Sequence, residues 1–118
     1  MATAVTMDKA ARYRDIARRV VTEYASYKLS YGEITTEAVI DETNDHYLVT
    51  HVGWDNKGRR VYGPVIHLDL IGEKLWIQQD STDWCVADAL LEAGVPKTDI
   101  VLGFQPAEVR PLTEFAVA

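Results

Sequence analysis

The stretch His46–Asp80 constrains the fold most, because it has the pattern of three consecutive antiparallel strands. Apolar and polar residues alternate along it with a period near two, and residues typical of turns interrupt the alternation at short intervals. The pair Gly72-Glu73 predicts a two-residue type II′ hairpin turn, whose first residue needs a positive φ that glycine adopts readily. This turn fixes how the two strands beside it pair.

The predicted pairing gives the sheet two chemically different faces. The apolar face consists of three cross-strand pairs: Leu70 with Leu75, Leu68 with Ile77, and Ile66 with Gln79. The other face is half polar and consists of Val65, His67 and Asp69 on one strand against Asp80, Gln78 and Trp76 on the next. A slip by one residue would exchange the two faces, so we expect the register to be strongly held.

Two further strands and their connections follow from the same pattern. The segment Glu33–Thr43 alternates loosely and predicts a strand before this stretch. A four-residue loop at Asp55–Gly58 would pair His51 with Tyr62 and Val52 with Val61. Pro64 has no N–H for the ladder, which predicts a bulge around Gly63-Pro64. Because of this bulge, the facing of His51 relative to His67 stays open.

Two amphipathic helices flank the strands. Apolar residues spaced by three and four predict a helix over 7–28 with Thr6 or Asp8 as its N-cap. A second helix is predicted over Trp84–Ala93, capped by Ser81-Thr82-Asp83, and a short buried strand over Ile100–Phe104. We therefore expect an α+β fold in which an N-terminal and a C-terminal helix pack on one face of a four- or five-stranded antiparallel sheet. Residues 1–6 are expected to be a flexible leader, and 7–118 a single domain.

Composition narrows the function classes. The net charge is −6 and the pI about 4.9, which argues against unaided binding to a nucleic-acid backbone. A single cysteine, Cys85, excludes an internal disulfide and a cysteine-rich zinc site. No apolar run approaches the roughly 20 residues that a membrane-spanning helix needs, and no export signal is visible. We therefore expect a cytoplasmic protein without a membrane partner.

The first helix carries a concentration of basic side chains that has two interpretations. They are Lys9, Arg12, Arg14, Arg18 and Arg19, five of the twelve basic residues. Charge runs of this kind are most often a solvated helix face. The alternative is a docking face for an acidic partner or for a phosphate backbone, with Arg12, Arg14, Arg18 and Arg19 as its candidate residues.

The half-polar sheet face also has two interpretations. His67 and Asp69, with Gln78 and Asp80 across the hairpin, could hold a divalent metal or form a His–Asp general base. A zinc site needs three or four well-directed ligands, and only His67 is placed on this face with certainty. A subunit interface is the favoured interpretation, because Trp76 and Val65 would otherwise be exposed. With Trp54 added, this face predicts a homodimer or higher homo-oligomer.

No residue set predicts an enzyme. Cys85 begins the second helix but has no histidine near it in sequence, so buried packing or simple tolerance is the favoured interpretation. The glycines form no nucleotide-binding loop, and no hydrolase or metalloprotease motif is present. The sequence therefore predicts no catalytic residue, no cofactor and no metal.

Short segments in order along nearly the whole chain resemble one known family. They are Tyr24-Ala25-Ser26-Tyr27, His46-Tyr47, His51-Val52-Gly53-Trp54, Arg59-Arg60-Val61-Tyr62-Gly63, His67-Leu68-Asp69, Trp76-Ile77-Gln78-Gln79-Asp80, Glu92-Ala93-Gly94-Val95-Pro96, Asp99-Ile100-Val101-Leu102-Gly103-Phe104 and Thr113-Glu114-Phe115-Ala116-Val117-Ala118. They resemble the XisI-like family, controlling factors for excision of a DNA element that interrupts a nitrogen-fixation gene in cyanobacteria. The chain departs from the family at Trp84-Cys85 and in a slightly long loop over Asp55–Gly58.

The resemblance implies an accessory role in programmed DNA excision. Members act together with XisH-like proteins, which resemble endonucleases, and with a site-specific recombinase. No catalytic motif belongs to the family, so none is carried over to this chain. The acidic charge fits a small protein that occupies a basic, DNA-facing surface of such a partner. A metal-binding or hydrolytic module on the His67 face, and a DNA-binding protein that uses the first-helix arginines, are the alternatives.

Overall fold

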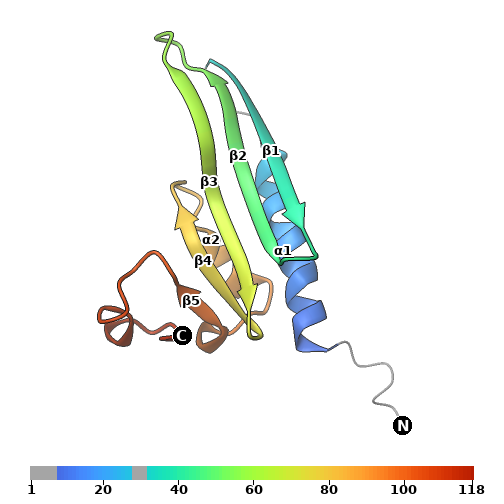
Figure 1. Ribbon diagram of the computed structural model, residues 1–118, viewed down its shortest axis with the longest axis vertical. Coiled ribbons are helices and arrows are strands. Elements are labelled where there is room, and N and C mark those ends of the chain that lie inside the picture. Colours follow the sequence, from blue (N-terminus) through green and yellow to red (C-terminus); the bar gives the residue numbers. More distant parts are fainter. Residues whose placement is uncertain (1–7, 28–31) are drawn as a thin grey trace.

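The computed structural model describes residues 8–27 and 32–118, and within these ranges the chain forms two α-helices and one five-stranded sheet (Figure 1). The elements are α1 (Lys9–Ala25), β1 (Glu33–Asp41), β2 (His46–Trp54), β3 (Arg60–Ile71), β4 (Lys74–Asp80), α2 (Val86–Glu92) and β5 (Ile100–Leu102), with short 3-10 turns η2 (Lys97–Asp99) and η3 (Arg110–Leu112). The α+β class is confirmed. The expected leader, residues 1–6, lies outside the described ranges.

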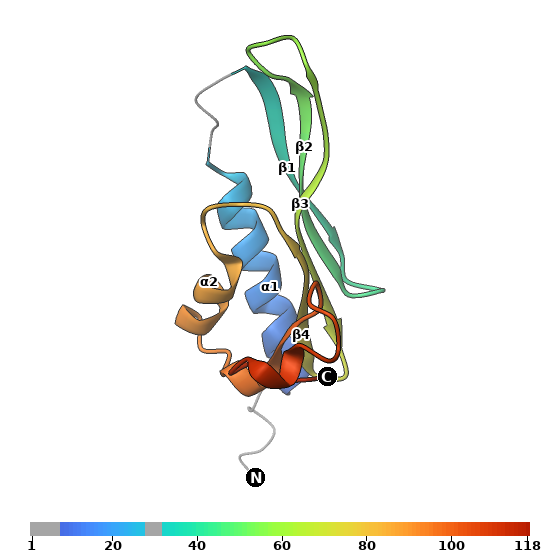
Figure 2. The ribbon, with the colours of Figure 1, turned by 90° about the vertical axis from the view of Figure 1, so that its left-hand side faces the viewer.

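The sheet is mixed, whereas the sequence predicted an antiparallel one. Its strand order is β1-β2-β3-β4-β5, and the first four strands form an antiparallel meander. β5 pairs parallel to β4, with Leu75 opposite Ile100. The reason is that α2 lies between these strands in the chain, and a crossover through a helix returns the next strand in the same direction. Both helices lie on one side of the sheet, and the far ends of β1, β2 and β3 extend beyond them (Figure 2).

The core lies between the helices and the inner face of the sheet. The buried side of α1 consists of Tyr13, Ile16, Ala17, Val20 and Val21, which confirms the predicted stripe. These residues share one cluster with buried residues of the sheet and of α2: Tyr47, Val49, Ile66, Leu68, Leu75, Ile77, Val86 and Leu90. Full burial of one large aliphatic side chain contributes about 1.5–3 kcal/mol, so this layer dominates the stability.

The ends of α1 follow from capping chemistry. Asp8 is the N-cap, as one of the two predicted candidates, and its Oδ1 accepts the N–H of Ala11 at 2.7 Å. The helix ends at Ala25, before the predicted end at residue 28, because Ser26 turns its hydroxyl back to the carbonyl of Glu23 at 2.6 Å. No helix in the described part of the chain is long and apolar enough to cross a membrane.

The β3–β4 hairpin confirms part of the predicted register and corrects the rest. Leu70 pairs with Leu75 and Leu68 with Ile77, as predicted. Further along, Ile66 lies opposite Asp80, not Gln79, because Gln78 is an extra residue that forms a bulge in β4. The turn is also different: Gly72 (φ 56°) and Glu73 (φ 65°) both have positive φ, as in a type I′ turn.

The β2–β3 register differs from the prediction by one residue. The loop has five residues, Asp55–Arg59, and consequently His51 lies opposite Gly63 and Val52 opposite Tyr62. The Asp55 carboxylate sets this length, since Oδ1 accepts the backbone N–H groups of Lys57 and Arg59, each at 2.9 Å. The bulge predicted near Pro64 is confirmed, with Val65 as the extra residue. Val65 packs against the core and therefore leaves the half-polar face to which it was assigned.

The start of α2 also corrects the sequence-based assignment. Asp80, not the segment Ser81–Asp83, satisfies the first turn: its Oδ2 accepts the N–H of Val86 at 2.8 Å. Cys85 occupies the N-cap position with φ 62°, and it is exposed, which excludes buried packing and leaves simple tolerance of the two predicted interpretations. Trp84 precedes the helix and contacts Tyr24, with ring centroids 5.3 Å apart.

A buried polar contact ties α1 to the C-terminal half. The hydroxyl of Tyr13 donates to Oδ2 of Asp99 at 2.5 Å, and Nζ of Lys9 lies 2.9 Å from the same oxygen. Burial, with the Asp99 hydrogen bond, raises the pKa of Tyr13 to about 12. Burial also acts to raise the pKa of Asp99, but the hydrogen bonds from Tyr13 and Lys9 outweigh it and hold that pKa below its ordinary value.

Leu68→Asp is predicted to unfold the protein. Leu68 is fully buried, and an unpaired carboxylate there would destabilise the fold by about 4 kcal/mol or more, a large part of the stability of an ordinary domain. Urea unfolding followed by circular dichroism measures this. Ile71→Asp, on the same strand but 49% exposed, is the matched control and should change stability by about 1 kcal/mol or less. Equal losses in both variants would contradict the assignment of the core.

Tyr13→Phe is predicted to destabilise the fold by about 1–3 kcal/mol at neutral pH, because the buried Asp99 carboxylate loses a donor. In the folded protein the pKa of Asp99 lies below its ordinary value of 3.8. The ionised carboxylate therefore contributes fully to the free energy of unfolding above about pH 4, and this contribution is lost as the pH falls through the lowered pKa. The difference in free energy of unfolding between the parent and Tyr13→Phe should therefore become smaller below about pH 4. Tyr27→Phe, at a half-exposed tyrosine, is the control in pH-dependent urea unfolding; an equal effect there would refute the prediction.

Candidate functional site

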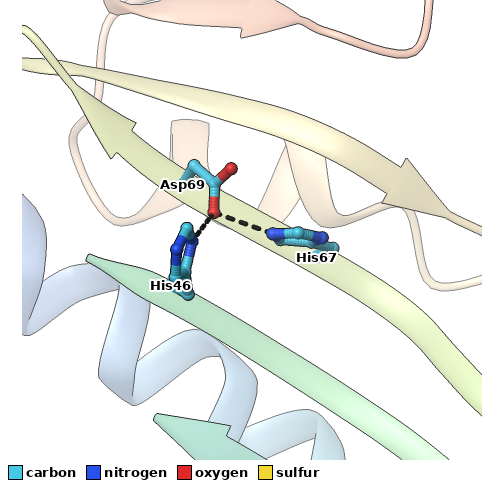
Figure 3. A group of neighbouring side chains, drawn as sticks. All are labelled: His46, His67 and Asp69. Atoms are coloured by element: carbon cyan, nitrogen blue, oxygen red, sulfur yellow. Dashed lines mark hydrogen bonds and ion pairs between the residues drawn. The ribbon is translucent and has the colours of Figure 1, made fainter. Parts of the chain in front are cut away.

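Two histidines and an aspartate meet on the sheet face that points away from the helices (Figure 3). Oδ1 of Asp69 lies 2.6 Å from Nδ1 of His46 and 2.7 Å from Nε2 of His67. Asp69 and His46 are directly opposite each other on β3 and β2, and His67 precedes Asp69 by two residues on the same strand. Side chains with these relations share a face of the sheet. We call these three residues the histidine–aspartate cluster.

The carboxylate of the cluster is buried and fully engaged. Asp69 is only 8% exposed, and its second oxygen, Oδ2, accepts the side-chain N–H of Gln78 at 3.1 Å. Burial acts to raise the pKa of Asp69, but hydrogen bonds from His46, His67 and Gln78 outweigh it and lower that pKa. The same contact with Asp69 raises the pKa of His46, and the nearby charge of Asp41 adds to that effect.

The structure brings together only part of the residue set predicted from sequence. His67, Asp69 and Gln78 meet as expected, whereas Asp80 turns toward the start of α2. His46 was missed, because its place opposite Asp69 depends on the loop length and bulge described above. His51 lies on β2 at an odd position with the buried Tyr47 and Val49, so it faces the helices and not the cluster. Imidazole nitrogens and a carboxylate oxygen are ligands that divalent transition metals favour.

Trp76, predicted as an interface residue, is covered by the chain's own C-terminal segment. The guanidinium of Arg110 lies 5.0 Å from the centre of its indole ring. Gly103 is packed so closely that a Cβ there would lie 3.1 Å from a Trp76 ring carbon. Ala116 continues this segment by bridging to Val101 of β5. The predicted homodimer face therefore has less free apolar surface than the sequence indicated.

An exposed aromatic cluster lies at the far end of the β2–β3 hairpin, beyond the helices (Figure 1). Trp54 is 52% exposed and Tyr62 is 78% exposed. The guanidinium of Arg60 lies between them, 5.1 Å from the Trp54 ring centre and 5.8 Å from that of Tyr62. We call Trp54, Arg60 and Tyr62 the ribbon-end cluster. Of the three, only Trp54 was a candidate interface residue in the sequence analysis.

The arginines of α1 are largely paired with carboxylates of this chain. Arg14 Nε lies 2.8 Å from Oδ1 of Asp45. Arg18 contacts Asp15 and lies 3.2 Å from Glu42, and Arg19 lies 3.0 Å from Asp15. Arg12 instead places its guanidinium 5.0 Å from the ring centre of Tyr13. These partners neutralise most of the positive charge that the sequence concentrates on this helix.

A hollow of about 430 Å³ lies between α1 and α2. Its polar lining combines Arg19 and Glu23 of α1 with Asp88 and Glu92 of α2, and Trp84 is its largest apolar residue. Neither a histidine nor Cys85 lines it. Nothing in the sequence pattern predicted this hollow.

Comparison with known proteins places the chain in a family. The model of the XisI protein family matches residues 7–117. A crystal structure of a XisI-like protein from Anabaena variabilis is 36% identical, with a TM-score of 0.84, over 92% of this chain and 99% of that one. The fdxN element excision controlling factor XisI from the same organism is 39% identical, with a TM-score of 0.77, over 94% of this chain and 100% of that one. A comparison with curated proteins gave no match. The chain belongs to the XisI family.

Proposed function

We propose that this protein is a non-catalytic controlling factor for programmed excision of a DNA element. It acts through protein–protein contacts with an XisH-like, nuclease-fold partner and with a site-specific recombinase. The family membership supports this proposal, as does the similarity to a fdxN element excision controlling factor. No catalytic motif is present in the sequence, and a regulatory protein needs a binding surface more than a reactive group.

The ribbon-end cluster is the observation that carries the proposal. Trp, Tyr and Arg are the residue types that contribute most to binding energy at protein interfaces. No element in the described part of the chain covers Trp54 or Tyr62, and stacking on Arg60 holds all three in one arrangement. Large aromatic surface exposed on a projecting ribbon is typical of a docking site. This cluster is the contact surface for the XisH-like partner.

The charge distribution favours a protein partner over DNA. The net charge is −6, and the α1 arginines Arg14, Arg18 and Arg19 are engaged by carboxylates of the same chain. Around the ribbon-end cluster, acidic and basic side chains are equal in number: Glu33, Glu37 and Asp55 against Lys57, Arg59 and Arg60. This end of the sheet therefore has no excess positive charge for a phosphate backbone, whereas the overall charge of −6 attracts a basic protein surface. Such a basic surface is what a nuclease-fold protein presents to DNA.

Trp54→Ala and Tyr62→Ala are each predicted to weaken capture of the XisH-like partner. Loss of an interface aromatic of this kind weakens binding by about 2 kcal/mol or more, which is roughly a 30-fold rise in Kd. The measurement is co-purification of the two proteins at modest salt, followed by Kd determination by calorimetry.

Leu112→Ala is the matched control, because Leu112 is 84% exposed but lies in the C-terminal segment, away from β2 and β3. It should leave the Kd unchanged. Parent protein that does not associate with the XisH-like partner would refute the proposal. Unchanged binding in both aromatic variants would instead refute this docking surface.

A further inference from the structure

We propose that the histidine–aspartate cluster is a binding site for one divalent transition-metal ion, with Zn²⁺ as the ion that its ligand set fits best. One nitrogen from each of His46 and His67 and one carboxylate oxygen of Asp69 lie within 4.8 Å of one another. Zinc is commonly bound by three protein ligands of these types, with a fourth position open to water or to another molecule.

The ligand atoms need only small movements to reach zinc geometry. In a tetrahedral site with bonds of about 2.0–2.2 Å, neighbouring ligand atoms are about 3.4 Å apart. The two imidazole nitrogens are now 2.6 and 2.7 Å from Oδ1 of Asp69. Rotation of the side chains that opens these distances by about 0.7 Å makes room for the ion. No strand has to move, because all three residues already share one face.

The cluster is built as metal sites are, with its ligands held by a second layer of contacts. Gln78 donates to Oδ2 of Asp69, which leaves Oδ1 directed at the two imidazoles (Figure 3). Asp69 is buried, while the side chain of His46 is 48% exposed. The carboxylate is thus fixed, and the ion can enter from solvent beside His46.

The surrounding charges favour a cation. The carboxylates of Asp41 and Asp45 act on His46 in addition to Asp69. Arg14 is paired with Asp45, 2.8 Å away, and therefore does not offset Asp69. With both imidazoles neutral, the three ligands carry one negative charge and leave one positive charge on bound zinc. The carboxylate of Asp41 lies close enough to His46 to compensate that charge.

Zinc binding to the tag-free full chain tests the proposal. Calorimetric titration of metal-stripped protein with zinc chloride at pH 7.5 should give one site per chain. His46→Ala and His67→Ala should each weaken binding at least tenfold, since each removes a ligand. Gln78→Ala should weaken it roughly 10- to 100-fold, as removal of a contact that orients a ligand does.

His51→Gln is the matched control, because His51 faces the other side of the sheet. This control should bind zinc with the same affinity as the parent. Zinc should raise the Tm of the parent and of the control, but it should not raise the Tm of the double variant His46→Ala, His67→Ala. Zinc affinity that is equal in the parent and in the double variant would overturn the proposal, as would an equal loss in the control. Circular dichroism confirms that each variant is folded. Capture of the XisH-like partner is measured without zinc. A failure of that capture therefore says nothing about zinc binding, and a failure of zinc binding says nothing about the capture.

Discussion

Burial of the apolar side of α1 against the inner face of the sheet is the interaction on which the rest of the structure depends. Ile16 and Val20 of α1 join Ile66 and Leu68 of β3 in one continuous cluster that excludes water. Since the side chains of a strand alternate between faces, burial of these residues directs His67 and its neighbours to the opposite face. The polar chemistry of the outer face is therefore a consequence of how the inner face packs.

Two β-bulges then adjust which outer residues meet. Each bulge inserts one residue and shifts the pairing beyond it. The bulge at Val65 turns this residue toward the core, and the bulge at Gln78 moves Asp80 to the position opposite the buried Ile66. There the Asp80 carboxylate accepts the N–H of Val86 at the start of α2. An irregularity that costs one ladder contact thus supplies a hydrogen bond to the first turn of a helix.

The sequence predicted what is decided locally and failed where distant pairing decides. Alternation identified the strands, and helical spacing identified α1, because both patterns reflect burial of one face. The place of His46 opposite Asp69 depends on two shifts: the five-residue loop that Asp55 closes and the bulge at Val65. Each moves the β2–β3 register by one residue, and together they move it by two. The loop was predicted one residue too short, and the bulge was predicted near Pro64 without its extra residue being identified, so the alternation pattern alone could not place His46 opposite Asp69.

The two proposed binding regions lie at opposite ends of the same two strands. β2 begins at His46 in the histidine–aspartate cluster and ends at Trp54 in the ribbon-end cluster. The end at His46 is backed by the helices, and the end at Trp54 projects beyond them (Figure 2). A metal ion would cross-link β2 to β3 at the supported end. Among the described residues, cross-strand pairing, the hydrogen bonds of Asp55 and the stack on Arg60 order the projecting end, and none of these contacts involves the ligands of the proposed ion.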